Sequence, residues 1–393
     1  MESIATVPRS DADIFSEEVM AAPYTVFREL RDAGPVVRLD RYDVLAVPRY
    51  AEARHVLGDW EAFSSADIAL NDRFNQYLEG SILSAAPPLH DRLRGVMASR
   101  LAPRAMRDLK PDITRRAEEL VERLVAKGSF DAVADLACWF PVEVVGDLIG
   151  LPREGRERLM PLVDANFNCF GPDSDRTRAS AAKLPELADY VMTSAARGAL
   201  TEGSMGSAVY EAADAGDIPQ ESAPWLVMGY VTAGMDTTVH AIGHAVWLLA
   251  EHPDQWDALR ADPSLVPQAF REVLRHESPV QVFGRTAAAD WTVGDLTVPA
   301  GSRLAILYGC ANRDERKWAD ADRFDITRAN ADHLAFGYGL HGCAGQALAR
   351  LEGEAILHAL LSRVRRIEAG EPVRHFNNVL RGLESLPVTV STD

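Results

Sequence analysis

The sequence predicts one large, mainly α-helical domain with a minor, N-terminally weighted β component. Residues 88–282 carry almost uninterrupted helical patterns, which makes helices the bulk of the chain. Short strand patterns occur near the N-terminus and again toward the C-terminus. No linker rich in Gly, Ser and Pro divides the 393 residues, so we expect residues 1–393 to form a single domain.

The expected elements follow one another along the chain. The segment PYTVFRELRDAGPVVRLDRYDVLAVPRYAEARHVLGD (23–59) predicts a helix, two short strands and a second helix. TVGDLTVPAG (292–301) predicts a hairpin, and SLPVTVSTD at the C-terminus predicts a strand. Breaks between helices are expected at six prolines: Pro103, Pro111, Pro152, Pro219, Pro253 and Pro263.

The least regular long stretch comprises residues 67–86. It mixes polar and aromatic side chains without a clear period. Long loops inside compact domains are often lids or binding loops. We therefore expect residues 67–86 to be a mobile loop that controls substrate access.

Composition excludes several classes of function. The net charge of −17 gives no support to a nucleic-acid partner. The N-terminus lacks the basic and apolar regions of a signal peptide, and no apolar run of about 18 residues exists to span a membrane. Four isolated cysteines lack disulfide or zinc spacing, which favours a reducing cytoplasmic location: Cys138, Cys169, Cys310 and Cys343.

Cys343 stands out because it lies in FGYGLHGCAG (336–345), directly before a helical pattern. Four glycines in ten residues let a flat ligand approach the backbone closely. A thiolate at a helix N-terminus is stabilised by unpaired N–H groups, and such a thiolate suits an axial ligand of haem iron. The alternative is an incidental cysteine in a glycine-rich turn. Phosphate binding is disfavoured because the Walker lysine is absent.

Two further patterns lie upstream of this loop. Glu272 and Arg275 are spaced i,i+3 and so share one helix face, as a buried ion pair or as a surface salt bridge. The stretch AGMDT (233–237) places an acid and an alcohol in the middle of a long apolar helix, beside small residues that let a helix deform. A mid-helix threonine would otherwise bond back to a carbonyl or face solvent.

Together these motifs resemble those of the bacterial cytochrome P-450 family, and the resemblance spans essentially the whole chain. It implies haem b ligated by Cys343 in a haem-cysteine loop at residues 336–345. It also implies that Phe336 packs near the sulfur and that Gly339 and Gly345 permit the tight turn. The central oxygen-binding helix would comprise residues 223–251.

The resemblance assigns three sets of residues. Asp236 and Thr237 would relay protons during oxygen activation. Glu272, Arg275 and Arg323 would form a buried structural network. A set of cationic or histidine side chains would bind the two haem propionates: His90, Arg94, Arg285 and His341.

Several segments are similar to the subfamily that O-demethylates para-methoxybenzoates. That similarity implies a pocket suited to a flat aryl substrate. Its expected lining is Phe74, Tyr77, Phe167, Phe170, Met228, Thr232, Ala233, Phe283, Gly284 and Leu380. The chain departs from the subfamily at its carboxylate anchor, with Met228 and Gly229 in place of arginine and serine and Tyr77 near the other expected arginine. We therefore expect a neutral or phenolic methoxy-aromatic rather than a benzoate, unless Arg73 folds inward.

The resemblance also implies dioxygen and two external electrons, because the chain has no GxGxxG nucleotide fingerprint. An NADH-dependent ferredoxin reductase and a ferredoxin are the expected donors. Their docking site would be the basic run Arg100, Arg104, Arg107 and Lys110. Other possibilities are hydroxylation of another small hydrophobic compound such as a terpenoid, a peroxide-driven peroxygenase, and a haem-binding sensor without turnover.

Overall fold

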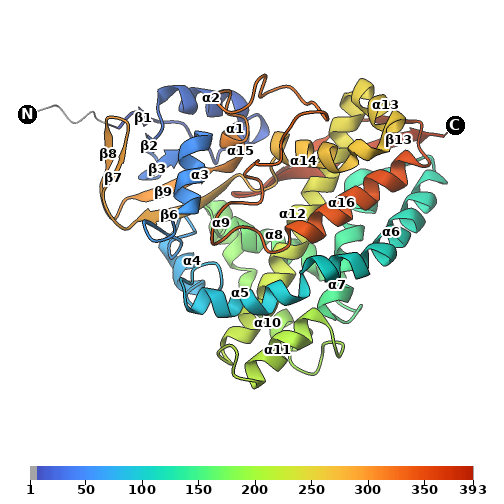
Figure 1. Ribbon diagram of the computed structural model, residues 1–393, viewed down its shortest axis with the longest axis horizontal. Helices are drawn as coiled ribbons and strands as arrows, with labels where there is room; N and C mark the ends of the chain where they lie inside the picture. The colour runs from blue at the N-terminus through green and yellow to red at the C-terminus, as the bar shows by residue number, and fades with distance from the viewer. Residues whose placement is uncertain (1–6, 393) are drawn as a thin grey trace, which may run out of the picture.

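The computed structural model describes residues 7–392 and shows a helical body with sheets along one side (Figure 1). The N-terminal helices and the largest sheet lie at one end, and the long helices α6 (Pro103–Val125) and α16 (Gln346–Leu361) lie at the other. This arrangement confirms the predicted mainly α-helical class.

The remaining helices follow one another along the chain, before and after the long central helix. The shorter ones before the central helix are α1 (Glu17–Ala21), α2 (Tyr24–Ala33), α3 (Tyr50–Gly58), α4 (Asp72–Tyr77), α5 (Leu89–Arg100), the π-helix Ala132–Ala137, α7 (Trp139–Ile149), the 3₁₀ turn Arg156–Arg158, α8 (Leu159–Asn168), α9 (Asp175–Ala181), α10 (Leu184–Thr193) and α11 (Met205–Asp214). The central helix and those after it are α12 (Ser222–Glu251), α13 (Pro253–Ala261), the 3₁₀ turn Pro263–Leu265, α14 (Val266–His276) and α15 (Tyr308–Ala311).

The largest sheet has six strands in the order β1-β2-β3-β9-β6-β4. Its members are β1 (Arg9–Ser10), β2 (Val37–Leu39), β3 (Val44–Val47), β9 (Arg303–Leu307), β6 (Val282–Ala287) and β4 (Phe63–Ser64). The N-terminal weighting predicted from the sequence holds for this sheet, because β1 to β4 all precede residue 65.

Three smaller sheets use strands from the second half of the chain together with β5 from the first half. The strand order β10-β13-β5 joins β10 (Arg366–Ala369), β13 (Pro387–Ser391) and β5 (Ser129–Asp131). Two hairpins complete the set: β7 (Trp291–Val293) with β8 (Leu296–Val298), and β11 (Val373–Phe376) with β12 (Arg381–Ser385). The helix–strand–strand–helix block, the hairpin near residue 295 and the C-terminal strand are therefore confirmed.

Two local expectations need correction. Pro111 lies inside α6 rather than at a helix boundary. Residues 67–86 are not a structureless loop, because Asn71 caps the short helix α4 by accepting from the Phe74 N–H at 2.9 Å. The same Asn71 donates to the Cys169 and Gly171 carbonyls at 2.8 and 2.7 Å, which anchors this segment to the end of α8. A single capping residue is a weak indication in the sequence, so the irregular pattern of residues 67–86 concealed the short helix.

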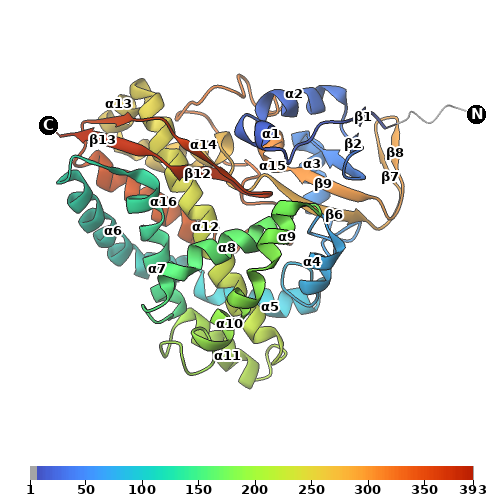
Figure 2. The same ribbon diagram turned by 180° about the vertical axis from the view of Figure 1, so that it is seen from behind.

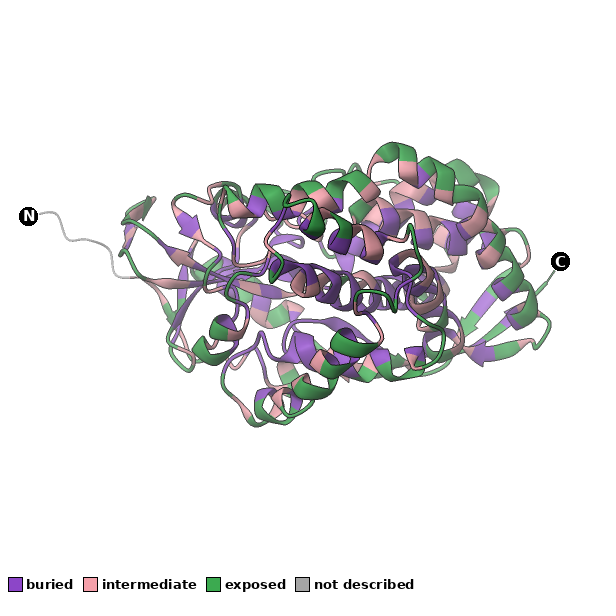
Figure 3. Cartoon of the chain, turned by 90° about the horizontal axis from the view of Figure 1, so that it is seen from below, coloured by how far each residue is buried: buried purple, intermediate pink, exposed green. Residues whose placement is uncertain are grey.

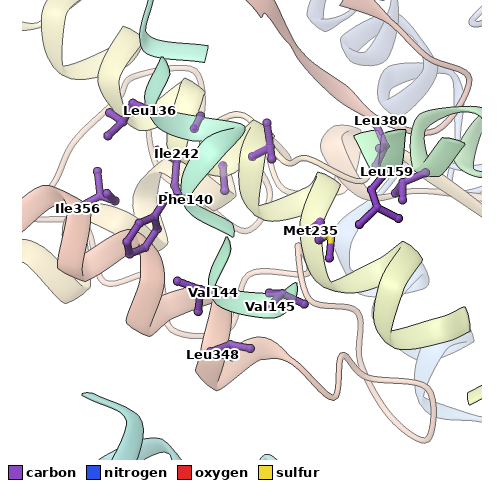
Figure 4. Close-up of a cluster of buried hydrophobic side chains, with 14 of the residues drawn as sticks. Leu136, Phe140, Val144, Val145, Leu159, Met235, Ile242, Leu348, Ile356 and Leu380 are labelled. Atoms are coloured by element: carbon purple, nitrogen blue, oxygen red, sulfur yellow. The ribbon is translucent and has the colours of Figure 1, made fainter. Parts of the chain in front are cut away.

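The core is built around α12, which runs through the middle of the body in both opposite views and packs against α7 and α16 (Figures 1 and 2). Residues 238–246 of this helix are buried without interruption, and the view from below shows buried backbone running through the middle of the molecule (Figure 3). Figure 4 shows Met235 and Ile242 of α12 beside side chains of α7 and α16, including Phe140 and Ile356. A helix that is apolar on most sides needs such covering, which places α12 at the centre of the fold.

Candidate active site

The stretch 336–345 folds as a tight loop before α16. The Cys343 N–H donates to the Phe336 carbonyl at 2.8 Å, which brings the two ends of the loop together. Gly339 has a φ of 71°, and a Cβ built on it would lie 2.4 Å from the Leu57 carbonyl oxygen. Glycine is therefore required at position 339, both for its backbone conformation and for the close approach to α3.

The role expected for Gly345 needs correction. Its φ of −85° is open to any residue, whereas Gly337 has a φ of 70°. The two left-handed turns of the loop are thus at Gly337 and Gly339. A Cβ on Gly345 would lie 4.0 Å from the Cys343 sulfur, so its bare Cα leaves space beside the sulfur instead.

The sulfur of Cys343 is surrounded by protein but remains partly accessible. Burial raises the pKa of the Cys343 thiol, while the Gly345 N–H and the charges of Arg94 and Arg350 act in the opposite direction. The backbone N–H groups at the start of α16 thus favour the thiolate, while burial opposes it. A metal cation bound at the sulfur would favour the thiolate further.

A strip of α12 is less covered than the rest of this central helix. Ala233 is exposed, and Gly229 and Thr237 are half-buried, whereas their neighbours Thr232 and Met235 are buried. The spacing i, i+4, i+8 puts the three uncovered residues on one face. They present a smooth surface without long side chains, which suits the face of a large flat ligand.

A second part of the site is a group of basic side chains around Arg285, in which, within the described part of the chain, only His90 lies beside a carboxylate, that of the exposed Asp91 at 3.2 Å. Arg285 of β6 is only 4% exposed, and its guanidinium has no carboxylate partner among residues 7–392. Its Nη1 donates to the Gly284 carbonyl at 2.7 Å, and burial lowers the pKa of Arg285. An unpaired buried guanidinium is costly, so an anion bound from outside the chain fits this position.

Three more of the predicted propionate ligands surround the same point. The rings of His90 and His341 lie with centroids 4.8 Å apart, and Arg94 donates to the Gly342 carbonyl at 2.7 Å. Burial and then the charges of Arg285, His90 and Arg94 lower the pKa of His341 to about 3. The four predicted side chains therefore lie close together, and such a group of nitrogen donors suits a ligand that carries carboxylates.

The acid and the alcohol of α12 differ in their surroundings. The Asp236 side chain is 2% exposed and lies 3.3 Å from Nε2 of His240, one turn further along. The Thr237 hydroxyl donates to the Ala233 carbonyl at 3.3 Å, the back-bonded state considered from the sequence. α12 runs without a break from Ser222 to Glu251, so the pair sits on a regular helix.

Glu272 and Arg275 form a fully buried, two-pronged ion pair. Nε and Nη2 of Arg275 donate to the two Glu272 oxygens, each at 2.8 Å. Arg328 is the third member, because its Nε donates to Oε1 of Glu272 at 3.1 Å. The expectation for Arg323 needs correction, since Arg323 contributes only its backbone carbonyl to this network.

The predicted pocket aromatics form one connected cluster drawn from distant segments. Phe74 of α4 contacts Phe170 edge-to-face at 4.9 Å, and Phe170 contacts Phe283 of β6 at 5.2 Å. Phe74 also stacks on Tyr77 at 5.4 Å, and Phe167 lies 6.2 Å from Phe170. Five rings from three regions of the chain therefore share one surface.

The other predicted pocket residues lie around these rings in different roles. Thr232 donates to the Met228 carbonyl at 2.9 Å, so its hydroxyl is already engaged. Gly284 packs closely against the 67–86 segment. A Cβ added at position 284 would lie 2.4 Å from the Asp67 carbonyl oxygen. Leu380 is 2% exposed, and its backbone forms an isolated antiparallel β-bridge with Val280, just before β6.

Sequence reasoning missed several residues of this region. Trp225 packs edge-to-face on Tyr77 at 5.0 Å, and Ser65 bonds Nε2 of His341 at 2.8 Å. Neither has a local motif that points to the site. His240 did carry a signal, because it follows Asp236 at i+4 and must share its helix face.

These features define a class of protein. Cys343 and Cys138 are the two partly accessible cysteines among the described residues, and within those residues no three His, Cys, Asp or Glu side chains gather as a metal site. A metal at Cys343 would therefore take its other ligands from a prosthetic group, and the cations at Arg285 fit the carboxylates of haem. The chain therefore has the site of a haem-thiolate protein, in which Cys343 supplies the protein ligand to iron.

Comparisons with known proteins agree with this class. Residues 211–379 match the family model of cytochrome P450. Cytochrome p450 CYP199A2 of Rhodopseudomonas palustris is 42% identical over 98% of this chain and 95% of its own length. This chain belongs to the cytochrome P450 family, whose members are haem-thiolate monooxygenases.

Solved structures agree on the fold. P450BioI in complex with hexadec-9Z-enoic acid ligated acyl carrier protein has a TM-score of 0.86 at 28% identity, covering 95% of this chain and 100% of that one. Cytochrome P450 CREJ in complex with (4-ethylphenyl) dihydrogen phosphate has a TM-score of 0.85 at 28% identity, covering 95% and 98%. None of the helices in residues 7–392 combines the length and apolar character needed to cross a bilayer.

Proposed function

We propose that this monooxygenase O-demethylates a small methoxy-aromatic compound, most favourably a neutral guaiacol-type phenol, and releases formaldehyde. The observation that carries the proposal is the cluster of five aromatic rings around Phe170. Aromatic walls bind a flat aryl ring well and give a long flexible chain less benefit. The related P450 in complex with (4-ethylphenyl) dihydrogen phosphate holds a small aryl compound on a similar fold.

The charge of the pocket separates phenols from benzoates. None of the ten residues that we assign to the pocket carries a charge. Met228 lies buried where an anchoring arginine would be needed, and Arg73 is exposed on α4. Burial raises the pKa of Tyr77, so its phenol stays a neutral hydrogen-bonding group. A benzoate would lose its hydration without gaining a partner, whereas a phenol would not.

The chain's own residues divide the work of the reaction. Haem, when bound, supplies the activation of dioxygen that the family performs. Cys343 would hold its iron, and the cations around Arg285 would hold its carboxylates. Thr237 lies on the uncovered strip of α12 and is directly preceded by the buried Asp236, so an acid and a hydroxyl are adjacent along the helix and can hold and pass on protons. The overall change consumes one methyl ether, dioxygen, two electrons and two protons, and gives a phenol, formaldehyde and water.

We further propose that a ferredoxin with an NADH-dependent reductase supplies the two electrons. Arg104, Arg107 and Lys110 are exposed on α6, which packs against the α16 helix that follows Cys343. A basic patch on an acidic chain offers a directed docking site for an acidic carrier. Arg100, the fourth predicted member, is half-buried and donates to the Gly203 carbonyl at 3.4 Å.

A ligand titration tests the substrate class. Guaiacol, 4-methoxyphenol and 4-methoxybenzoate are added to the holoprotein, and the spin-state change of the haem is followed. We expect tighter binding of the phenols, with formaldehyde formed in step with NADH consumption when a ferredoxin system is added. Tighter binding of 4-methoxybenzoate would contradict the neutral-substrate proposal, and absence of formaldehyde with every ligand would contradict O-demethylation itself.

A matched pair of variants sharpens this test. Met228→Arg adds a cation at the missing anchor position, and Met228→Gln adds a neutral side chain of similar length. The arginine variant should bind 4-methoxybenzoate at least about tenfold more tightly relative to 4-methoxyphenol, because it pairs the buried carboxylate. An equal change in both variants would show that shape, not charge, controls the preference.

A further inference from the structure

Four titratable side chains form a chain that leads outward from Asp236. Nε2 of His240 lies 3.3 Å from Oδ1 of Asp236 on the same helix. The ring of His240 stacks on the ring of His375 from β11, with centroids 5.1 Å apart and planes at 27°. Nε2 of His375 lies 2.8 Å from Oδ1 of Asp164 on α8. Three separate elements thus contribute to one line of acid and imidazole groups.

The accessibility of these side chains increases steadily along the line. Asp236 is 2% exposed and His240 is 5% exposed. His375 is 22% exposed and Asp164 is 27% exposed. One end therefore lies in the interior beside the reactive strip of α12, and the other end is in contact with solvent.

The backbone is shaped to admit this arrangement. Gly382 of β12 is paired with His375 across the β11–β12 hairpin. A Cβ on Gly382 would lie 1.8 Å from Nδ1 of His240, so any other residue there would displace the ring. β12 runs against α12 in this region (Figure 2). Within the described residues, neither nitrogen of His240 has a hydrogen-bond partner of good geometry, so the ring is packed but not fixed by such a bond.

The charges around the stacked rings favour one shared proton. Two imidazolium ions at this distance would repel each other, while each ring has its own carboxylate neighbour. Burial lowers the pKa of His375, but the hydrogen bond and charge of Asp164 outweigh it and raise the pKa overall. The charged or titratable groups that face the two rings are Asp164, Asp236, Glu384 and His244. The hydrogen bond and charge of Asp164 therefore favour the protonated form of His375, one ring away from the Asp236 side.

We propose that His375 and His240 relay protons from solvent at Asp164 to Asp236 during turnover. Each passage takes one proton from water at the Asp164–His375 end and delivers one proton to the Asp236 carboxylate. No electron moves, and both imidazoles finish in the state in which they began. This proposal rests on the proton-delivery role proposed above for Asp236, but it is independent of which aromatic compound is the substrate.

The first test compares peroxide release in matched variants. His240→Gln, His375→Gln and Asp164→Asn each interrupt the relay, and His252→Gln removes an imidazole at the C-terminal end of α12 as the control. With any ligand that shifts the spin state, the three relay variants should release at least about threefold more hydrogen peroxide per NADH, and His252→Gln should match the wild type. Because Asp164 is partly exposed, its variant tests the relay even where a buried variant fails to bind haem.

A spectroscopic readout separates a relay from a purely structural ion pair. In the diamagnetic ferrous carbon monoxide complex, ¹⁵N NMR follows the titration of His240 and His375. A shared proton predicts linked titration curves, and Asp236→Asn should shift the curve of His375 although the two side chains belong to different elements. Independent curves, or relay variants with wild-type peroxide release, would overturn the proposal.

The Asp236→Asn variant tests the role of Asp236 separately from the relay through His240 and His375. If Asp236→Asn alone raises peroxide release, the role of Asp236 stands and the relay is overturned. If Asp236→Asn leaves peroxide release unchanged, both the role of Asp236 and the relay that serves it are overturned. A changed substrate preference affects neither result.

Discussion

The two sides of the active site are built in different ways. On the cysteine side, residues 336–345 form a single loop whose shape depends on Gly337 and Gly339 and on one hydrogen bond within the loop. On the aromatic side, Phe74, Phe170 and Phe283 come from segments that lie about a hundred residues apart in the sequence. The chemistry is thus encoded locally, whereas the pocket exists only once the chain has folded.

Because of this difference, the two sides should tolerate substitutions to different degrees. The loop fails if one residue changes its backbone or its sulfur, because nothing else in the chain replaces either. The cluster shares its contacts among five rings, so one substitution changes its shape without abolishing it. Substitutions on the two sides should therefore differ in kind as well as in size.

The largest effect is expected from Cys343→Ala. Removing the sulfur removes the only protein ligand to iron that we assign, so the thiolate-type band of the reduced carbon monoxide complex should disappear completely. The absorption spectrum of the reduced protein with carbon monoxide measures this directly. Cys138→Ala is the control, because burial and the charges of Asp236 and Asp131 raise the pKa of this thiol to about 12. A thiolate-type band that persists in Cys343→Ala would refute the assignment.

The next largest effect is expected from Glu272→Gln. It leaves the guanidiniums of Arg275 and Arg328 facing a neutral group in a fully buried site. Breaking a buried pair in this way destabilises a protein by about 3–5 kcal/mol. Urea unfolding of the holoprotein measures the change. Arg323→Gln should alter stability by no more than about 0.5 kcal/mol, since this residue contributes a backbone carbonyl only. Equal losses of stability in both variants would show that the Arg323 side chain also belongs to the buried network.

The sequence allowed prediction of what depends on local order. The loop at Cys343, the Glu272–Arg275 pair and the helix–strand–strand–helix block all follow from spacings of a few residues. Arg328 was missed because two arginines five residues apart are equivalent in sequence, and only the tertiary fold decides which one points inward. Trp225 and Ser65 were missed for the same reason: their site contacts involve residues more than a hundred positions away.

A smaller effect is expected from Phe170→Leu. Phe170 is 3% exposed and touches three other rings of the cluster. A similar-sized aliphatic side chain keeps most of the packing, so the loss of stability should be about 1 kcal/mol. Affinity for aryl ligands should nevertheless fall about tenfold, as the edge-to-face contacts disappear.

Phe140→Leu provides the matched control for this substitution. Phe140 is fully buried on α7 among Ile356 and Ile242 of the helical core, as Figure 4 shows. Its replacement should cost similar stability and leave the spin-state titration unchanged. If both variants weaken aryl binding equally, the ring cluster does not form the substrate wall.

The smallest effect concerns pH and the contact between His375 and Asp164. The pKa of His375 is raised by its carboxylate partner despite burial, so this pair stabilises the fold fully below the unfolded-state value of about 6.5 and loses its contribution as pH rises through the higher folded value. The pKa of Asp164 is lowered in spite of burial, so its contribution is retained above about 3.9. His375→Gln should therefore be less stable than the wild type by at most about 1 kcal/mol at pH 6, and by less at pH 9.

Urea unfolding of wild type and His375→Gln at pH 6 and pH 9 measures this difference, and Asp164→Asn should remove its pH dependence. A difference that grows toward pH 9 would contradict the assigned sign. The outcome bears on the comparison of the two sides, because this pair belongs to neither the cysteine loop nor the ring cluster. It joins α8, which carries Phe167, to the hairpin that packs on His240 of α12. If the His375–Asp164 pair adds little to the free energy of unfolding, its main effect is electrostatic. The pair would then connect the helix that carries Phe167 with His240 and Asp236 through charge rather than through packing.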